Sequence, residues 1–349
     1  MTDNIDLFVT NYNKNFTGVS ATTANVLQKQ AQTYNLRLVG CSLPECPKPV
    51  SRATAYSFAR TKPRNKPFSI WHVRRNNEMR DAIIARDMLR LPIKIVFTSA
   101  AQRRHSLVPR WLISKMDTVI ATTELAASYV PNVGAIIPHG VNTEKFKPSN
   151  NLIEAWKKTG YPGAKGIATV GRIRKEKGTD LFVDSMIRIL PNMKDLTALI
   201  IGKAGDKDKR FLENLKSKVN TAGLKDRIIF TGEISAEKLP SIFRSLSLLV
   251  ALPRYEGFGM TPLEGMASGV PFVASSTGYF KEFSDQGRCG KVVPIGDVNS
   301  AVHYINLFLT EEASRNEASI RSRKVASETY SISTEVQLIS DVYKQLWSL

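Results

Sequence analysis

Residues Arg254–Gly269 read RYEGFGMTPLEGMASG, a glycine-rich turn that runs into a helix and carries two carboxylates. Gly257 and Gly259 have no side chain, so the backbone of the turn can approach a ligand closely. The first amides of the helix have no intrahelical partner and present the positive end of the helix dipole to an anion. Glu256 and Glu264, about two turns apart, can each accept hydrogen bonds from a polyol. The stretch therefore predicts a site for a sugar bound to a diphosphate.

The alternative is a solvated turn with two surface glutamates, since short motifs match by chance. The residues that follow favour the site. A helix of small residues, a buried strand over Val270–Ala274 and a second glycine turn at Gly278 make a β-α-β repeat. The turn also follows the apolar run Leu246–Leu252, and open parallel sheets bind ligands at the carboxyl ends of their strands.

Strand and helix patterns alternate along the whole chain, which predicts an α/β fold with parallel sheets. We expect two domains, residues 1–150 and 151–332, because 349 residues exceed one ordinary domain. The amphipathic stretch 333–349 predicts a final helix. The expected strands of the first half are Leu7–Thr10, Leu36–Val39, Phe68–Val73, Ile93–Phe97, Thr118–Ala121 and Gly134–Ile137. Those of the second half are Gly166–Val170, Thr197–Ile201, Arg227–Phe230, Leu246–Leu252, Pro271–Ala274 and Gly290–Val293.

Composition indicates a globular protein with an ample core, because 42% of the residues are hydrophobic. No apolar run approaches the roughly 20 residues that span a bilayer, and Met1–Thr10 is acidic and strand-like, so we expect a cytoplasmic protein. The three cysteines have no metal-ligand spacing and are interpreted as reduced thiols.

The net charge of +18 is concentrated in one segment. Between Arg60 and Lys115 there are 14 Lys and Arg against three acidic residues, with apolar residues at helical spacing among them. Such a surface is attracted to anionic lipid headgroups. A solvated helix whose apolar side is core is the alternative. A basic nucleic-acid-binding protein is less favoured, because aromatic interleaving, a zinc pattern and a helix-turn-helix are missing. The apolar residues are Met79, Ile83, Ile84, Met88, Leu89, Leu107, Val108, Trp111 and Leu112.

A second candidate segment, TVGRIRKEKGTD at Thr169–Asp180, places two cations in a loop between a strand and a helix that starts near Thr179. Arg172 as a bidentate fork and Lys177 as a point charge can neutralise a diphosphate without a metal. A solvated loop is the alternative. No D-x-D motif lies near these segments, so we expect no metal site.

A third segment, FTGVSAT at Phe16–Thr22, follows the first strand. Gly18 lets this loop pass close to a donor phosphate or an acceptor, and the helix is expected to start at Ala21 or Thr22. The loop has neither the P-loop pattern nor the G-x-G-x-x-G fingerprint of dinucleotide sites.

These segments together resemble the retaining glycosyltransferases of family 4, whose E-x7-E motif is matched by Glu256 and Glu264. The order of the motifs agrees over nearly the whole chain, including PHGVNTEKFKP at Pro138–Pro148, which in the family enters the interdomain linker. The resemblance implies the GT-B fold, two Rossmann-like domains facing a cleft, with the last helix packed back on the first domain.

The resemblance also implies roles for single residues. Arg172 and Lys177 would stabilise the departing nucleotide diphosphate, Glu256 would orient the sugar and Glu264 the ribose, with no cofactor beyond the nucleotide sugar. The catalytic residues implied are Arg172, Lys177 and Glu256; the donor-binding residues are these three with Gly18, Gly257, Phe258, Gly259, Met260, Thr261 and Glu264.

One departure concerns histidine. Many relatives carry a His directly after the strand that ends here in VFTS, but His105 comes several residues later. Either His105 acts from a longer loop, or His72 occupies its place, or both are structural. His139 and His303 are interpreted as structural.

The segments Ser69–Met79, Val96–Ser106 and Asp117–Glu124 look like those of bacterial lipopolysaccharide core mannosyltransferases, which extend the inner core from GDP-mannose onto an acidic Kdo sugar. That similarity implies an anionic glycolipid acceptor at the cytoplasmic face of the inner membrane. A UDP-sugar donor, a different anionic lipid, and a non-catalytic binding module remain as alternatives. The acceptor-side candidates are His72, Arg74, Arg75, Arg103, Arg104 and His105.

Overall fold

The computed structural model describes residues 4–15 and 17–348, and the chain forms two compact units. Unit 1 comprises Met1–Gly140 and Ile332–Leu349, and unit 2 comprises Val141–Ser331. The chain leaves unit 1 after Gly140, before residue 150 where the sequence suggested a boundary. The reason is local, because the Val141 N–H donates to the Tyr330 carbonyl at 2.8 Å and Phe146 lies in the core of unit 2.

Unit 1 is built on a parallel six-stranded sheet in the order β2-β1-β3-β4-β5-β6, and helices cover both faces. Strands β1 and β3 are buried along their whole length because both faces of the sheet are covered. The parallel sheet predicted from the alternating pattern is confirmed. The strands are β1 (Leu7–Asn11), β2 (Leu36–Gly40), β3 (Ser69–Val73), β4 (Ile93–Ser99), β5 (Thr118–Ala121) and β6 (Val133–Ile136).

The helices of unit 1 form two layers. One core contains buried side chains of α2, α3 and α4, and the core on the other face contains those of α1 and α14. The helices are α1 (Gly18–Gln30), α2 (Arg52–Ala59), α3 (Asn76–Ile83), the π-helical turn η1 (Ile84–Met88), α4 (Leu107–Ser114), α5 (Glu124–Ala127) and α14 (Ile332–Trp347).

Helix α1 begins earlier than the sequence suggested. It starts at Gly18 rather than at Ala21 or Thr22, because the Thr17 side chain caps it and accepts the Ser20 N–H. Gly18 therefore lies in the first helical turn, and Phe16 of the predicted loop lies outside the described residues.

Unit 2 has a second parallel six-stranded sheet, in the order β12-β11-β10-β7-β8-β9. The chain lays down β7, β8 and β9 in one direction, then returns to place β10 on the other side of β7. The strand order reverses between β7 and β10, and such a reversal opens a crevice at the carboxyl ends of the strands. The strands are β7 (Lys165–Val170), β8 (Leu196–Ile201), β9 (Ile228–Gly232), β10 (Leu248–Ala251), β11 (Phe272–Ser275) and β12 (Gly290–Val293).

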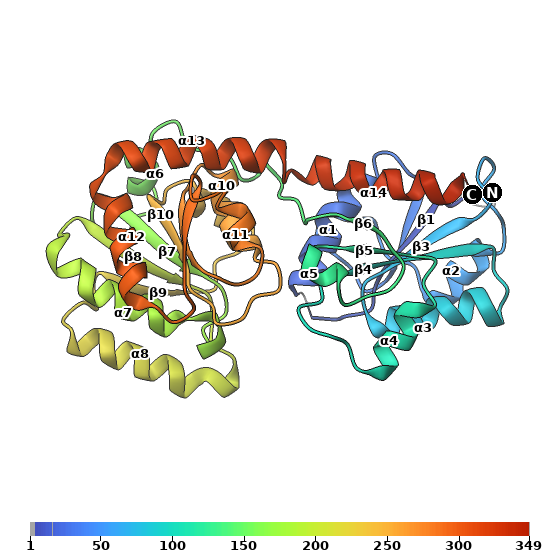
Figure 1. Ribbon diagram of the computed structural model, residues 1–349, viewed down its shortest axis with the longest axis horizontal. Helices are drawn as coiled ribbons and strands as arrows, with labels where there is room; N and C mark the ends of the chain where they lie inside the picture. Colours follow the sequence, from blue (N-terminus) through green and yellow to red (C-terminus); the bar gives the residue numbers. More distant parts are fainter. Residues whose placement is uncertain (1–3, 16, 349) are drawn as a thin grey trace. The chain divides into compact units, whose positions relative to one another are not determined.

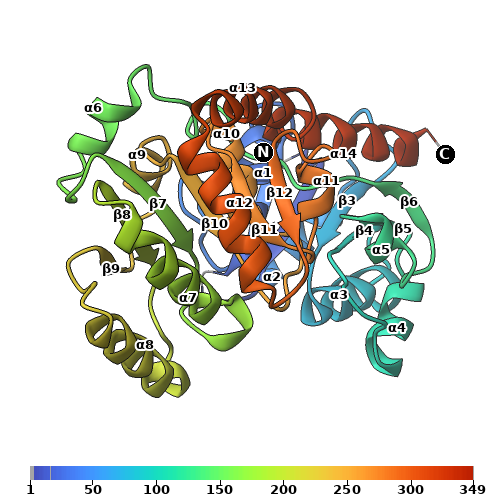
Figure 2. The same ribbon diagram turned by 60° about the vertical axis from the view of Figure 1, so that its left-hand side comes forward.

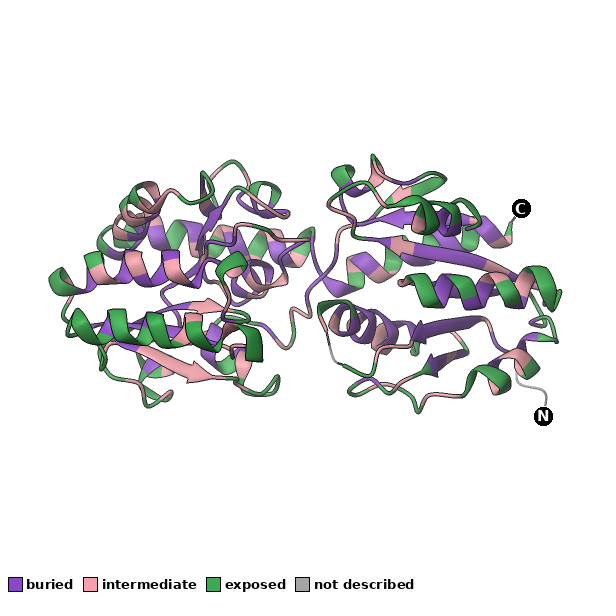
Figure 3. Cartoon of the chain, turned by 90° about the horizontal axis from the view of Figure 1, so that it is seen from below, coloured by how far each residue is buried: buried purple, intermediate pink, exposed green. Residues whose placement is uncertain are grey.

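Both faces of this sheet are also covered. Helices α7, α8 and α12 supply the core on one face, and α6, α9, α10 and α11 that on the other. The strands are largely buried, whereas the outer faces of the helices are exposed (Figure 3). The helices are α6 (Leu152–Lys157), η2 (Lys175–Lys177), α7 (Thr179–Ile189), η3 (Leu190–Asn192), η4 (Asp206–Asp208), α8 (Lys209–Thr221), α9 (Leu239–Phe243), α10 (Met260–Ala267), α11 (Phe280–Phe283), α12 (Val298–Thr310) and α13 (Glu312–Glu328). Among the described residues, no helix is long and apolar enough to cross a membrane.

The final helix, α14, packs on α1 within unit 1 (Figure 1). The Tyr343 hydroxyl accepts from Gln30 Nε2 at 3.2 Å and lies 2.5 Å from His72 Nδ1, and Trp347 Nε1 donates to the Phe68 carbonyl at 3.0 Å. These bonds join the end of the chain to β3 and α1. Leu349 lies outside the described residues.

We expect Tyr343→Phe to reduce the free energy of unfolding by about 1–3 kcal/mol, because it leaves buried polar groups of His72 and Gln30 without their partner. Thermal and urea unfolding measure the change. Tyr255→Phe is the matched control, because that side chain is 53% exposed and should change stability little. Equal stability of the two variants would contradict the role of the buried hydroxyl.

Candidate active site at the carboxyl edge of the second sheet

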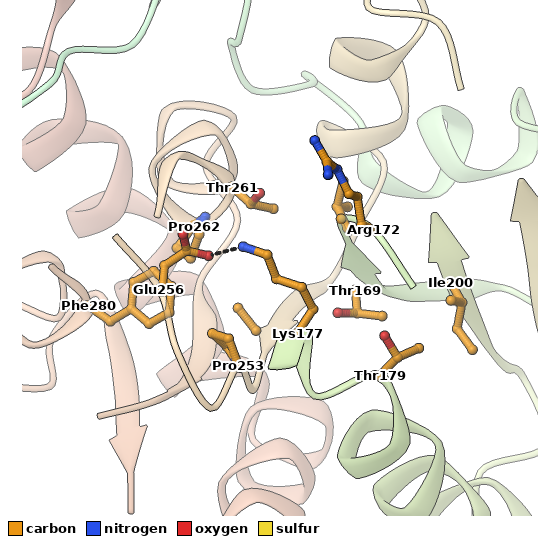
Figure 4. Close-up of a pocket in the computed structure, with 13 residues that line it drawn as sticks. Thr169, Arg172, Lys177, Thr179, Ile200, Pro253, Glu256, Thr261, Pro262 and Phe280 are labelled. Atoms are coloured by element: carbon orange, nitrogen blue, oxygen red, sulfur yellow. Dashed lines mark hydrogen bonds and ion pairs between the residues drawn. The ribbon is translucent and has the colours of Figure 1, made fainter. Parts of the chain in front are cut away.

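The reversal between β7 and β10 brings together the two loops that the sequence singled out. Residues 171–178 follow β7 and residues 252–259 follow β10. They line one cavity with the end of β7 and the start of α10 (Figure 4). Its lining includes Thr169, Arg172, Lys177, Thr179, Pro253, Glu256, Thr261 and Phe280.

Lys177 and Glu256 meet inside this cavity. Lys177 Nζ lies 2.6 Å from Glu256 Oε2, and about a quarter of each side chain is exposed. The other carboxylate oxygen accepts the N–H of Gly257 at 3.0 Å, and the Glu256 N–H donates to Thr277 Oγ1 at 3.2 Å. A cation for a phosphate and a carboxylate for a hydroxyl thus lie side by side, and each neutralises the other.

Arg172 lines the same cavity but is exposed and does not contact the ion pair. In Figure 4 the Lys177 side chain reaches across to Glu256, whereas Arg172 extends away from the pair. Thr261 lies at the start of α10, whose N-cap, Gly259, makes no side-chain capping bond. The N–H groups of Met260 and Thr261 therefore remain available to an anion, whereas Pro262 has none.

The glycines of the two loops serve different purposes. Gly178 has φ 67°, and a Cβ there would lie 1.8 Å from the Leu252 carbonyl, so the loops touch backbone to backbone. Gly259 has φ 99°, and its Cβ would lie 2.0 Å from the Phe280 ring. A Cβ on Gly257 would meet nothing within 4 Å. Of the glycines in the 254–259 turn, Gly257 is thus the one beside open space, and Gly259 is required by packing.

Three predicted donor-binding residues do not direct their side chains into the cavity. Phe258 is buried and stacks on Tyr279, with ring centroids 5.2 Å apart, and Met260 packs against the core. Neither side chain lines the cavity. Glu264, one turn beyond Thr261, is absent from the cavity lining. Burial raises the pKa of Glu264 to about 8, although the charge of Lys145 opposes the shift.

A second ion pair, which the sequence did not predict, holds the two loops together. Arg254 forms a bidentate pair with Asp180, with Nη1 2.8 Å from Oδ1 and Nη2 2.7 Å from Oδ2. Its backbone N–H also donates to the Glu176 carbonyl at 2.8 Å, and its Nη1 donates to the Lys175 carbonyl. The sequence did contain a signal for this pair, because the segment Thr169–Asp180 ends in an acidic residue and the segment Arg254–Gly269 begins with a basic one. These bonds fix the turn that presents Lys177 to Glu256.

In unit 1 the strand order reverses between β1 and β3, and Arg74, Arg75 and the α1 N-terminus lie at this reversal. Arg75 donates to Asn11 Oδ1, Glu78 Oε1 and Ser20 Oγ at 2.9–3.1 Å, so it holds the loop after β1 in place. In the neighbouring Arg74, Nη1 is buried and has no hydrogen-bond partner among the described residues. Arg74, unlike Arg75, therefore has a free N–H donor that could bind a ligand.

His72 does not fit the predicted contact with an acceptor. It is fully buried in β3, with Nδ1 2.5 Å from the Tyr343 hydroxyl and Nε2 2.7 Å from Thr98 Oγ1. Burial, and next the charge of Arg74, lower the pKa of His72 well below its usual value. Neutral and bonded at both nitrogens, His72 is a structural residue. His139, with Nδ1 3.0 Å from Glu335 Oε1, is bonded within unit 1 as the structural interpretation expects.

Arg103, Arg104 and His105 lie in the segment between β4 and α4. Both arginines are exposed. Burial, and next Arg103, lower the pKa of His105, whose Nε2 has no hydrogen-bond partner in the described part of the chain. Across residues 4–15 and 17–348, no group of three or more Asp, Glu, His or Cys could hold a metal ion.

Parallel six-stranded sheets in two units, with a charged cavity at the strand reversal of unit 2, are the arrangement of the GT-B fold. The family model for "Glycosyl transferases group 1" matches residues 153–325. The chain belongs to this family. It is 38% identical to the lipopolysaccharide core biosynthesis mannosyltransferase LpsB of Rhizobium meliloti (strain 1021), over 98% of each chain. It is 34% identical to LpcC of Rhizobium leguminosarum bv. viciae, over 98% of this chain and 97% of the relative.

Solved structures agree on the fold. Anabaena HepE, in complex with UDP and glucose, superposes with a TM-score of 0.82 at 15% identity, over 98% of this chain and 100% of that chain. The C-terminal domain of LpcC from Francisella tularensis is 32% identical, with a TM-score of 0.54, and covers 55% of this chain and 100% of its own. The relatives named mannosyltransferases and the family match identify this chain as a hexosyltransferase.

A double-mutant cycle on Arg254→Ala and Asp180→Ala should give a coupling energy of about 1 kcal/mol, because the pair is bidentate and less than a third exposed. Chemical unfolding of the two single variants and the double variant measures it. Lys203→Ala and Glu233→Ala form the control cycle, because those side chains are 71% and 65% exposed and should couple more weakly. A larger coupling energy in the control cycle would contradict the proposed role of the Arg254–Asp180 pair in holding the two loops together.

The raised pKa of Glu264 predicts a pH-dependent stability. Between its usual value near 4.5 and its folded value of about 8, the folded protein holds a proton that the unfolded chain has lost. This group therefore makes the protein less stable as pH rises through that interval. Glu264→Gln, which cannot titrate, should lose less stability than the wild type between pH 5 and pH 8 in thermal unfolding. Parallel pH profiles would refute the shift.

Proposed function

We propose that this glycosyltransferase moves mannose from GDP-mannose, with retention of configuration and without a metal, onto an anionic glycolipid such as the Kdo of the lipopolysaccharide inner core. It would do so as a peripheral protein at the cytoplasmic face of the inner membrane. The full-length similarity to LpsB and LpcC, both named lipopolysaccharide core biosynthesis mannosyltransferases, supports the sugar and the acceptor class.

The observation that carries the proposal is the Lys177–Glu256 ion pair at the strand reversal. Donor binding would exchange partners: the diphosphate takes Lys177, and a sugar hydroxyl takes Glu256. The exposed Arg172 can turn toward the diphosphate, and the uncapped amides of α10 add a partial positive charge. These groups meet the negative charge that grows on the leaving diphosphate, the electrostatic contribution that is usually the largest in such sites.

The same pair argues against Glu256 as a general base. Its carboxylate is bonded to Lys177 and to the Gly257 N–H, so it is suited to orient hydroxyls rather than to accept a proton. No other dedicated base lines the cavity among the described residues. We propose that the leaving phosphate assists the incoming hydroxyl, which keeps the reaction on one face of the sugar.

Lys177→Ala and Glu256→Ala should each lower kcat/KM by at least about 100-fold, because each removes a charged contact to the donor. Transfer from GDP-mannose to a Kdo-lipid A acceptor is the assay, and circular dichroism checks the fold. Lys175→Ala is the matched control, since this lysine lies in the same turn but its exposed side chain is outside the cavity. Full activity of either active-site variant would refute the assignment.

Thermal shift with GDP, UDP and ADP, each with EDTA or magnesium, tests the donor. A stabilisation by GDP that exceeds the others and does not need magnesium supports the proposal. A preference for UDP would retain the catalytic residues and replace mannose by the sugar of a UDP donor.

A further inference from the structure

The outer face of unit 1 exposes apolar side chains that the proposed reaction does not use. Leu107, Val108 and Trp111 of α4 are 80%, 69% and 56% exposed, and Met88 and Leu89 at the end of η1 are 75% and 50% exposed. We call these five residues the α4 patch. Large apolar residues scattered singly on a surface are ordinary, but a cluster such as this marks a binding surface.

Contacts within unit 1 place the two parts of the patch on neighbouring elements. Helices α3 and α4 pack together (Figures 1 and 2). The π-helical turn η1 continues directly from α3. Lys115, just after α4, lies 6.0 Å above the Trp111 ring, and its charge also helps to lower the pKa of Asp87 in η1, after the larger effect of Arg86. Lys115 thus lies close to both parts of the patch.

The sequence explains why these residues face outward. In α4, Leu112 and Ile113 are buried in the core of unit 1 with Met116, so the positions opposite them must point to solvent. A helix that needs only to cover the sheet would carry polar residues there. Instead α4 has Leu107, Val108 and Trp111 on that side.

The charges around the patch indicate what covers it. Residues 84–115 contain seven Lys and Arg against a single acidic residue, Asp87, which is bonded to Arg86 at 2.7 Å. Arg104 and Arg110 line a groove beside α4 together with Leu107 and Trp111. Apolar side chains that include a tryptophan, surrounded by arginines, match the boundary between acyl chains and anionic headgroups.

We propose that the α4 patch docks this enzyme on an anionic lipid bilayer, with Trp111 and Leu107 inserted among the acyl chains and Arg104 and Arg110 on the headgroup phosphates. The choice of a lipid surface as the partner rests on the proposed function, which requires a glycolipid acceptor. The surface itself is assigned from exposure and charge alone.

Vesicle cosedimentation tests the proposal without donor or acceptor. The full chain should bind vesicles of phosphatidylglycerol and phosphatidylcholine, bind phosphatidylcholine alone more weakly, and release as salt is raised. Trp111 is the most exposed of the four tryptophans, since Trp71 and Trp156 are buried and Trp347 is partly buried, so binding should shift its fluorescence to shorter wavelength.

Two double variants of the patch, each with a matched double variant in unit 2, separate the patch from a general loss of apolar surface or charge. Leu107→Gln with Trp111→Gln should weaken binding to anionic vesicles by at least about tenfold. Its control, Ile153→Gln with Ile320→Gln, alters exposed apolar residues of unit 2 and should not weaken binding.

Arg104→Gln with Arg110→Gln should weaken vesicle binding similarly. Its control, Lys207→Gln with Arg210→Gln, removes the same charge from exposed positions in unit 2 and should weaken binding less.

Three results would overturn the proposal. The wild type could fail to bind anionic vesicles, the control pairs could lose as much binding as the patch pairs, or the patch could instead hold a second copy of the chain. In the last case, analytical ultracentrifugation would reveal a dimer that the Leu107→Gln and Trp111→Gln variant dissociates. Vesicle binding without a GDP-induced thermal shift would refute the donor assignment alone, so the two failures are distinguishable.

Discussion

The backbone contact between Gly178 and the carbonyl of Leu252 is the constraint on which the candidate active site depends. The strand order of unit 2 reverses between β7 and β10, so the loops after these strands leave the sheet side by side. Only a glycine in the left-handed region permits the close approach at residue 178. Because that contact is fixed, Lys177 and Glu256 project from neighbouring backbones and meet at 2.6 Å.

The sequence predicted the strands and the parallel sheets well, because buried parallel strands read as short apolar runs whose pattern is local. It also selected Lys177 and Glu256 as partners of one ligand, although they are far apart along the chain, because each follows a strand and strand ends share one edge of the sheet. The strands and the pairing of Lys177 with Glu256 can both be predicted from local sequence patterns and a general rule of sheet topology.

The remaining features depend on contacts that no local pattern contains. Histidine is a residue type that often binds ligands, and its place at a strand end made His72 a candidate. In the structure, however, Tyr343 of α14 lies against His72, which is a buried structural residue. Arg75 is likewise occupied by Asn11, Glu78 and Ser20. The start of α1 was misplaced because Thr17 caps the helix where the sequence suggested a loop.

The two units meet the same physical requirement at their strand reversals with different residues. In unit 2 the Arg254–Asp180 pair ties the loops after β7 and β10. In unit 1 the buried carboxylate of Glu78 accepts from the N–H groups of Tyr12 and Arg74, which follow β1 and β3. A buried acid needs compensation, and Arg75 supplies it at 2.9 Å. Arg75 is thus required by the fold, and a count of basic residues at this reversal does not by itself indicate a ligand. The feature that indicates a ligand in unit 1 is the free N–H donor of Arg74.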